Sequence, residues 1–294
     1  ISQRVPFTHR SHQTQKSRKA KRTLSSSTMD CYQLNTSASA CSVDCILFDL
    51  DDTLYSSKCG ISEALRKNID QFLVEKCGFP EDDAPVIRSR LFKSYGSSLA
   101  GLRALGYDID ADEYHNFVHG RLPYSSIKPN SRLRSILLGI SQRKIIFTNS
   151  DRAHAERALK RLGIEDCFEQ IICFETMNPY LSQSTRPDEF PVVLKPSLDA
   201  MRIAVRVAKI DPRRTLFLDD NVHNVAAGKA VGLQTILVGK TIRVAGADCC
   251  LETVDELGQV LAKICVGGIP KDSQATGRAR SQVNSFTNTA AVNA

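Results

Sequence analysis

Short apolar segments recur along the chain and alternate with stretches of helical spacing. The first, residues 45–48, runs directly into a cluster of acids, Asp49, Asp51 and Asp52, and lies in a strand predicted at residues 44–49. An unbroken apolar run of this length predicts a strand buried on both faces, as in a parallel sheet. Residues 178–194 are rich in proline, lack periodicity and are predicted to form a loop. Further strands are predicted at residues 144–149, 171–174, 215–219 and 234–238.

Helices are predicted between these strands. Ile61, Leu65, Ile69, Phe72 and Leu73 recur at spacings of three and four, which is the pattern of an amphipathic helix. Further helices are predicted at residues 86–95, 99–105, 112–119, 152–162, 196–209, 222–231 and 254–264.

This alternation predicts an α/β fold, a doubly wound, Rossmann-like parallel sheet with helices on both faces. Residues 58–135 show no strand pattern and are long for a simple crossover, so we interpret them as an inserted all-helical cap domain. The core domain then comprises residues 44–57 and 136–266. The basic, polar extension at residues 1–43 and the polar tail at 267–294 are predicted to be disordered.

The basic character of the chain belongs to its beginning. The net charge is +7, from 39 basic and 32 acidic residues, but residues 1–28 alone hold seven Lys or Arg and no acid. The rest of the chain is therefore neutral. The leader resembles an organellar transit peptide, it could be a nucleic-acid patch, or it precedes a true start at Met29, the first methionine.

Cysteine usage and hydropathy suggest a compartment. Ten cysteines are scattered without a C-x-x-C pair or zinc spacing, which favours reduced thiols. No apolar run approaches the roughly 20 residues that span a bilayer. We expect a cytoplasmic or nuclear protein, organellar if the leader is a transit peptide, with no membrane partner and no specific nucleic-acid binding. The oligomeric state is left open.

Polar residues follow four of the predicted strands and loops. Carboxyl ends of parallel strands share one edge of the sheet, so these residues can meet in space. Carboxylates forced together repel, and a hard cation such as Mg²⁺ relieves that repulsion. A lone acidic pair would more often be a solvated turn, but the four sets together suit phosphoryl transfer. The sets are Asp49 with Asp51, Thr148 with Asn149, Lys195, and Asp219 with Asp220.

These sets resemble the four motifs of the haloacid dehalogenase (HAD) superfamily. The first motif, DxDxT, matches Asp49, Asp51 and Thr53, and the second and third match Thr148 and Lys195. The fourth motif, a paired acid, matches Asp219-Asp220. The resemblance implies a phosphatase rather than a dehalogenase, because dehalogenating members lack the second Asp of the first motif.

The resemblance also implies roles for these residues. Asp49 would be the nucleophile, forming an aspartyl-phosphate, and Asp51 the general acid and base. Thr148, Asn149 and Lys195 would bind the phosphoryl group. Mg²⁺ would be held by the Asp49 and Asp220 side chains and the Asp51 carbonyl, supported by Asp219.

A closer resemblance covers about residues 44–240. Residues 95–102, 117–124, 148–155 and 217–221 resemble segments of the pyrimidine 5′-nucleotidase-like subfamily common in plants and fungi. This implies a nucleoside 5′-monophosphate as substrate. His119, Arg121 and Tyr124, in the predicted cap, are candidates for contacting its base.

Alternatives from other classes stay open. The chain could hydrolyse another small phosphorylated metabolite, accept phosphate as a signalling domain, or be a non-catalytic interaction protein. Among other polar residues, Asp52 is interpreted as a turn residue, and His154 and His223 as residues on helix surfaces.

Overall fold

Six parallel strands form one sheet in the order β3-β2-β1-β4-β5-β6 in this computed structural model. It describes residues 42–181, 191–240, 244 and 246–267. The strands are β1 (Cys45–Phe48), β2 (Arg143–Phe147), β3 (Gln170–Ile172), β4 (Thr215–Asp219), β5 (Gln234–Val238) and β6 (Cys249–Leu251). The predicted α/β class and parallel sheet are confirmed.

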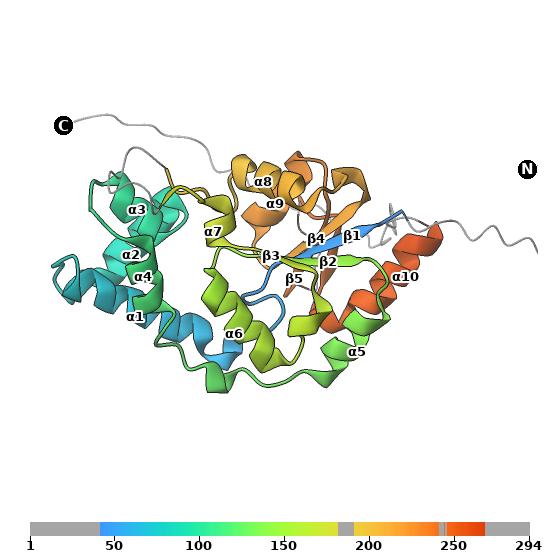
Figure 1. Ribbon diagram of the computed structural model, residues 1–294, viewed down its shortest axis with the longest axis horizontal. Coiled ribbons are helices and arrows are strands. Elements are labelled where there is room, and N and C mark those ends of the chain that lie inside the picture. The colour runs from blue at the N-terminus through green and yellow to red at the C-terminus, as the bar shows by residue number, and fades with distance from the viewer. Residues whose placement is uncertain (1–41, 182–190, 241–243, 245, 268–294) are drawn as a thin grey trace, which may run out of the picture. The chain divides into compact units, whose positions relative to one another are not determined.

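Alternation along β1 divides the core into two layers. Ile46 and Phe48 point to one face and Cys45 and Leu47 to the other, and all four are fully buried. The first face is covered by α5 (Ser131–Gly139), α6 (Arg152–Leu162) and α10 (Leu257–Gly267), and the second by α7 (Phe174–Met177), α8 (Leu198–Ala208) and α9 (Val222–Ala230) (Figure 1). Helices on both faces explain why every residue of β1 is apolar.

Four helices follow β1 before α5 leads the chain back to the sheet. They are α1 (Ile61–Glu75), α2 (Ala84–Tyr95), α3 (Ser98–Ala104) and α4 (Ala111–Val118), grouped beside the sheet in Figure 1. We call residues 57–130 the helical insert. Phe72 of α1 contacts Tyr114 and Phe117 of α4 edge-to-face, with ring centroids 4.9 and 5.3 Å apart. These aromatic contacts join the first and last helices of the insert.

Short elements account for most differences from the predicted pattern. The sequence analysis missed β6, α5 and α7; β6 and α7 are three and four residues long, too short for a periodicity to show. The predicted domain boundary at residue 135 lies within α5, whose Leu133 and Leu137 pack in the same cluster as Leu257. The division into core and cap domains stays a prediction.

Helix ends also differ by a few residues. The helix predicted from residue 196 begins at Leu198, because the Ser197 side chain accepts from Ala200 N and caps it. The helix predicted from residue 254 begins with a 3₁₀ turn and becomes α-helical at Leu257. The predicted disorder of 1–43 and 267–294 concerns segments that lie almost wholly outside the described residues, and so does half of the predicted loop at 178–194.

Two expectations of the sequence analysis concern reduced cysteines and the lack of a membrane-spanning segment. The buried Cys45, Cys167 and Cys173 are free thiols. Cys265 departs from the expectation, because it is disulfide-bonded. None of the described helices combines the length and apolar character needed to cross a membrane.

Candidate active site

Lys195 lies at the centre of a buried charge cluster at the carboxyl edge of the sheet. Its Nζ donates to Asp49 Oδ1 at 2.7 Å, to Asp219 Oδ2 at 2.8 Å and to the carbonyl oxygen of Phe147 at 2.8 Å. Asp49 follows β1, Phe147 ends β2 and Asp219 ends β4. Three neighbouring strands thus bring these groups to one ammonium, as the parallel topology predicts.

Asn149 holds the segment that carries Lys195. Its side-chain oxygen accepts from Lys195 N at 2.8 Å, and its amide nitrogen donates to Lys195 O at 2.9 Å. This pair of hydrogen bonds fixes the backbone of Lys195 relative to the end of β2. Asn149, predicted to bind phosphate, is therefore also a residue that positions the lysine.

Burial and mutual charge shift the pKa values within the cluster. Desolvation raises the pKa of Asp49 well above its usual value, against the opposing effect of Lys195. Lys195 is itself buried, yet its two carboxylate neighbours raise its pKa, so the ammonium stays protonated. Burial, with Asp219 next to it, raises the pKa of Asp220 to about 6. Ionisation of all three carboxyls would therefore place more negative charge at this edge than Lys195 alone neutralises.

Asp49, Asp219 and Asp220 are placed to hold a cation. One oxygen from each lies within 4.8 Å of the others. Asp219 is already bonded by Asn221 N, Asn224 and Lys195. Asp220 has no ion pair with any residue that the structure describes. A set of carboxylate oxygens this close together fits a hard divalent ion, which Asp49, Asp219 and Asp220 would hold.

Asp51 points to a different set of partners. Its Oδ1 accepts from His154 Nε2 at 2.7 Å and from the Tyr55 hydroxyl, and its Oδ2 accepts from Ser150 Oγ at 2.8 Å. Although burial opposes it, these donors and the His154 charge lower the pKa of Asp51 below its usual value. Thr148 Oγ1 is 3.5 Å from Asp51 Oδ2 and is almost fully buried. In the free protein Asp51 is therefore a carboxylate.

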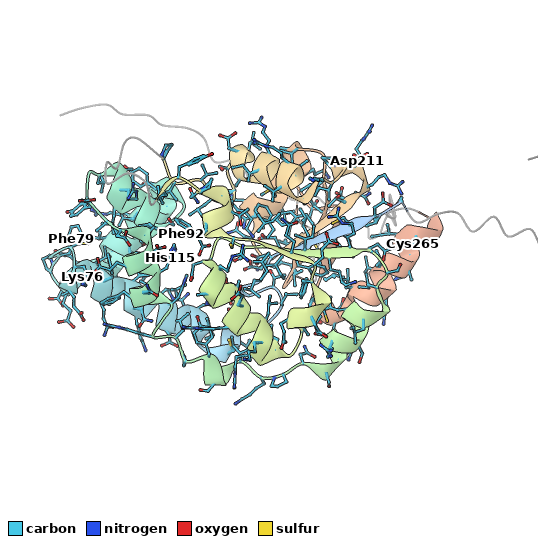
Figure 2. All side chains as sticks on the ribbon, in the orientation of Figure 1. Lys76, Phe79, Phe92, His115, Asp211 and Cys265 are labelled. Carbon is cyan, nitrogen blue, oxygen red and sulfur yellow. The ribbon has the colours of Figure 1, made fainter. Side chains whose placement is uncertain are left out.

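A cavity of about 400 Å³ opens beside Asp51, between the strand ends and the helical insert. Asp52, in a left-handed turn with φ 62°, lines it and accepts from Ser62 Oγ at 2.8 Å, as a turn residue and not a ligand. Figure 2 labels two of the insert side chains that line it, Phe92 and His115. Apolar lining residues are Ile61, Leu65, Ile69, Leu99, Val118, Phe174 and Leu194, and polar ones include Ser62, Arg66, Arg88, Ser97, Asn149 and Ser150.

Of the three insert candidates, only His119 reaches this cavity. Its Nδ1 bonds to the Asp151 carboxylate, and burial lowers the pKa of His119. Arg121 instead lies over the Phe117 ring, 3.8 Å from its centroid. The Tyr124 hydroxyl lies 2.9 Å from His154 Nδ1. Neither Arg121 nor Tyr124 lines the cavity, so the structure does not support their predicted contact with a base.

The interpretation of His154 as a surface residue was wrong. Its side chain is 1% exposed and bonds to Asp51. A signal was available, because His154 lies four and eight positions before Ala158 and Leu162 on the buried face of α6. Helical spacing could thus have predicted burial, although not the partner. His223 is exposed, as interpreted.

The fold and the cluster define an α/β enzyme of the hydrolase type, with its reactive carboxylates at the sheet edge. Residues 43–232 match the haloacid dehalogenase-like hydrolase family, and the chain belongs to that family. The predicted superfamily is therefore confirmed.

Relatives with assigned names agree with this membership. Phosphate metabolism protein 8 of Saccharomyces cerevisiae is 28% identical over 199 residues, which are 65% of this chain and 60% of that protein. The chain thus spans less than two thirds of the yeast relative. N-acetylmuramic acid 6-phosphate phosphatase of Pseudomonas aeruginosa is 24% identical over 66% of this chain and 80% of its own length. Enzymes named as phosphatases among the relatives support the predicted HAD-type phosphatase.

Solved structures support the fold. An HAD phosphatase from Thermococcus onnurineus has a TM-score of 0.50 at 18% identity and covers 77% of this chain and 99% of its own. CbbY from Rhodobacter sphaeroides, in complex with phosphate, has a TM-score of 0.50 at 20% identity and covers 74% of this chain and 96% of its own.

Proposed function

We propose that this protein is a Mg²⁺-dependent phosphomonoesterase that acts through an aspartyl-phosphate on Asp49, with nucleoside 5′-monophosphates as substrates. The observation that carries the proposal is the charge cluster. A buried ammonium bonds Asp49 and Asp219 while Asp220 lies beside them with no ion pair among the described residues, and Asp51 lies next to a cavity of substrate size.

In the first step an Asp49 oxygen attacks phosphorus, and the bond between phosphorus and the alcohol oxygen breaks. Asp51 gives a proton to that departing oxygen. Asp51 is a carboxylate in the free protein, so this proton arrives with the substrate, whose monoanion carries one below a second pKa of about 6. In the second step water attacks the phosphorus of the aspartyl-phosphate and gives a proton to Asp51, and the bond between phosphorus and the Asp49 oxygen breaks. Asp51 then passes this proton to the departing phosphate, so both aspartates are carboxylates again.

Charge neutralisation favours both steps. Lys195 stays protonated and lies 2.7 Å from Asp49, where it offsets charge on the nucleophile and the incoming phosphoryl oxygens. Thr148 and Asn149 would complete the phosphoryl site. A bound Mg²⁺, held by Asp49 and Asp220 with Asp219 in support and the Asp51 carbonyl as a further ligand, would supply electrostatic screening between two anions.

The cavity lining supports a nucleotide as substrate. Leu65, Ile69 and Leu99 form apolar walls suited to a planar base, and Ser97 and Arg66 offer donors to its edge. Arg66 is exposed and has no ion pair among the described residues. The helical insert would thus act as a cap domain that selects the alcohol, in line with the pyrimidine 5′-nucleotidase-like subfamily. Another small phosphorylated metabolite is the second candidate, since the named relatives differ in substrate.

The mechanism is tested with nitrophenyl phosphate as a generic substrate. Wild type is expected to turn over only with Mg²⁺ and to lose activity in excess chelator. Protein quenched in acid during turnover is expected to carry one phosphoryl group on a peptide containing Asp49. Full activity with chelator, or no phosphoryl group on that peptide, would contradict the mechanism.

The substrate is tested separately by a panel of phosphate esters. We expect the largest kcat/KM for a nucleoside 5′-monophosphate, compared with sugar phosphates and amino-sugar phosphates. A larger kcat/KM for a sugar phosphate would replace the nucleotide proposal with the second candidate and leave the phosphatase mechanism unaffected.

A further inference from the structure

Asp51 is held by side chains from three separate segments. Tyr55 belongs to the turn after β1, Ser150 follows β2, and His154 lies one helical turn further along in α6. Both carboxylate oxygens are engaged, Oδ1 by His154 at 2.7 Å and Oδ2 by Ser150 at 2.8 Å. Two donors on different oxygens leave the carboxylate one orientation about its terminal bond.

His154 is in turn fixed at its other nitrogen. Nδ1 lies 2.9 Å from the Tyr124 hydroxyl, which also lies 3.3 Å from the carbonyl oxygen of His119. Because the Asp51 carboxylate has no hydrogen to donate, Nε2 of His154 must carry one. The ring plane is also packed against His119, with centroids 4.7 Å apart. The imidazole therefore has no freedom to turn away from Asp51.

The buried position of His154 points to a specific role, because burying an imidazole is energetically unfavourable unless both of its nitrogens have partners. Here one partner is Asp51, 103 positions away, and the other is on the return segment of the helical insert. Neither the fold of α6 nor the apolar core needs a polar side chain at this position, where Ala158 and Leu162 continue the buried face.

We propose that His154 is a positioning residue that orients the Asp51 carboxylate toward the scissile oxygen, and that Tyr124 orients His154. The inference rests on the proposed function, in which Asp51 transfers the proton. It assigns no contact between His154 and substrate. It gives Tyr124 a role in proton transfer in place of the base contact predicted for it.

Proton donation matters most for a poor leaving group. An alkoxide needs a proton as its bond to phosphorus breaks, whereas nitrophenolate departs with little help. Losing a correctly placed general acid costs about 10²–10⁴-fold on the demanding substrate. Misplacing Asp51 should therefore lower turnover of alkyl phosphates much more than turnover of nitrophenyl phosphate. A purely structural defect would lower both by the same factor.

The test compares kcat on a nucleoside 5′-monophosphate and on nitrophenyl phosphate. For His154→Leu we expect about a 10²-fold loss on the alkyl ester and less than about tenfold on the aryl ester. His154→Gln, which retains an N–H donor, should recover most of the loss. Tyr124→Phe should show the same selectivity at smaller size. Asp51→Asn is the reference for complete loss of the acid.

A structural readout accompanies the kinetics. The crystal structure of His154→Leu is expected to show the Asp51 side chain in more than one rotamer, with Ser150 still in place. If His154→Leu does not fold, His154→Gln and Tyr124→Phe carry the comparison. Equal losses on both esters, or a single unchanged Asp51 rotamer, would overturn the inference. A wild type that hydrolyses neither ester would instead overturn the proposed function, and this inference with it.

Discussion

The charge cluster and the insert wall of the cavity are built in opposite ways. Lys195 has three acceptors within 2.8 Å, and its side chain and that of Asp219 are essentially inaccessible to solvent. On the insert wall, Phe92 is 59% exposed, Arg66 is unpaired among the described residues, and the Arg88–Asp70 pair is partly solvated. The side chains of Lys195 and Asp219 are shielded from solvent and hydrogen-bonded, whereas the insert wall of the cavity is partly open to solvent.

This difference separates reaction from selection. In the desolvated cluster the carboxylates need the Lys195 ammonium, so a substitution that removes the ammonium changes both folding and reactivity. On the insert wall a side chain contacts few others, so a substitution there changes what fits with little effect on folding. Relatives with one chemistry and different substrates are expected from such a division.

The largest expected effect comes from the nucleophile. Asp49→Asn should lower kcat on nitrophenyl phosphate by about 10⁴-fold or more, because an amide does not attack phosphorus. The melting temperature should change little, since the amide oxygen can still accept from Lys195. Asp52→Asn, a neighbour outside the cluster, is the matched control and should cost less than about tenfold. Comparable losses in the two variants would remove Asp49 from its assigned role.

Removing the ammonium should damage folding as well as turnover. Lys195→Met leaves Asp49 and Asp219 buried without their counter-charge, which should lower the free energy of unfolding by about 3–5 kcal/mol. Lys229→Met removes a surface ion pair with Asp248, 2.7 Å long, and should cost only about 0–1 kcal/mol. Denaturant unfolding at neutral pH measures both. A Lys195→Met protein as stable as Lys229→Met would mean that the cluster is not desolvated.

Asp151 should make stability depend on pH. The His119 hydrogen bond, acting against burial, lowers its pKa to about 2. A lowered pKa means that the carboxylate stabilises the fold above its ordinary pKa near 4, and that this stabilisation is lost as pH falls toward 2. Asp151→Asn keeps an oxygen that can cap His154 N and removes the charge. It should lower the free energy of unfolding by about 1–3 kcal/mol at pH 7 and by little at pH 2.

The control for this prediction is an exposed carboxylate with a similar shift. Arg134 lowers the pKa of Asp166 to about 2, but solvent screens that ion pair. Asp166→Asn should therefore lower the free energy of unfolding at pH 7 by less than Asp151→Asn does. Unfolding free energies measured between pH 2 and 7 decide the matter. If the loss of unfolding free energy in Asp151→Asn is the same at every pH in this range, the charge of Asp151 does not stabilise the fold.

The smallest expected effect lies on the insert wall. Arg66→Ala should raise KM for the preferred nucleotide by about tenfold, the loss of roughly one charged hydrogen bond, and leave nitrophenyl phosphate unaffected. Arg121→Ala should change neither KM, because Arg121 lies on Phe117 outside the cavity. Steady-state kinetics on both substrates measure this. An effect of Arg121→Ala on the nucleotide alone would restore Arg121 as a base contact.

Local pattern was enough to predict the sheet and the polar residues at its edge. The apolar run of β1 could be buried only between two layers of helices, and parallel strands must end at a common edge. Asp49, Asp219 and Lys195 each follow a strand or open a helix, so their meeting could be inferred without coordinates. The short β6 and α7 were not predicted, because a segment of three or four residues is too short to show a hydrophobic periodicity.

The amino-acid sequence by itself thus determined the α/β architecture and which side chains gather at the sheet edge, because both follow from short-range periodicity and one rule of topology. Only the tertiary structure decided the partners of Asp51, the path of Arg121 away from the cavity and the burial of Asp151 with His119. The contacts of His154 with Asp51 and Tyr124, and of His119 with Asp151, join residues 30 to 103 positions apart. Their geometry depends on how the helical insert packs against α6, and no local pattern encodes that packing.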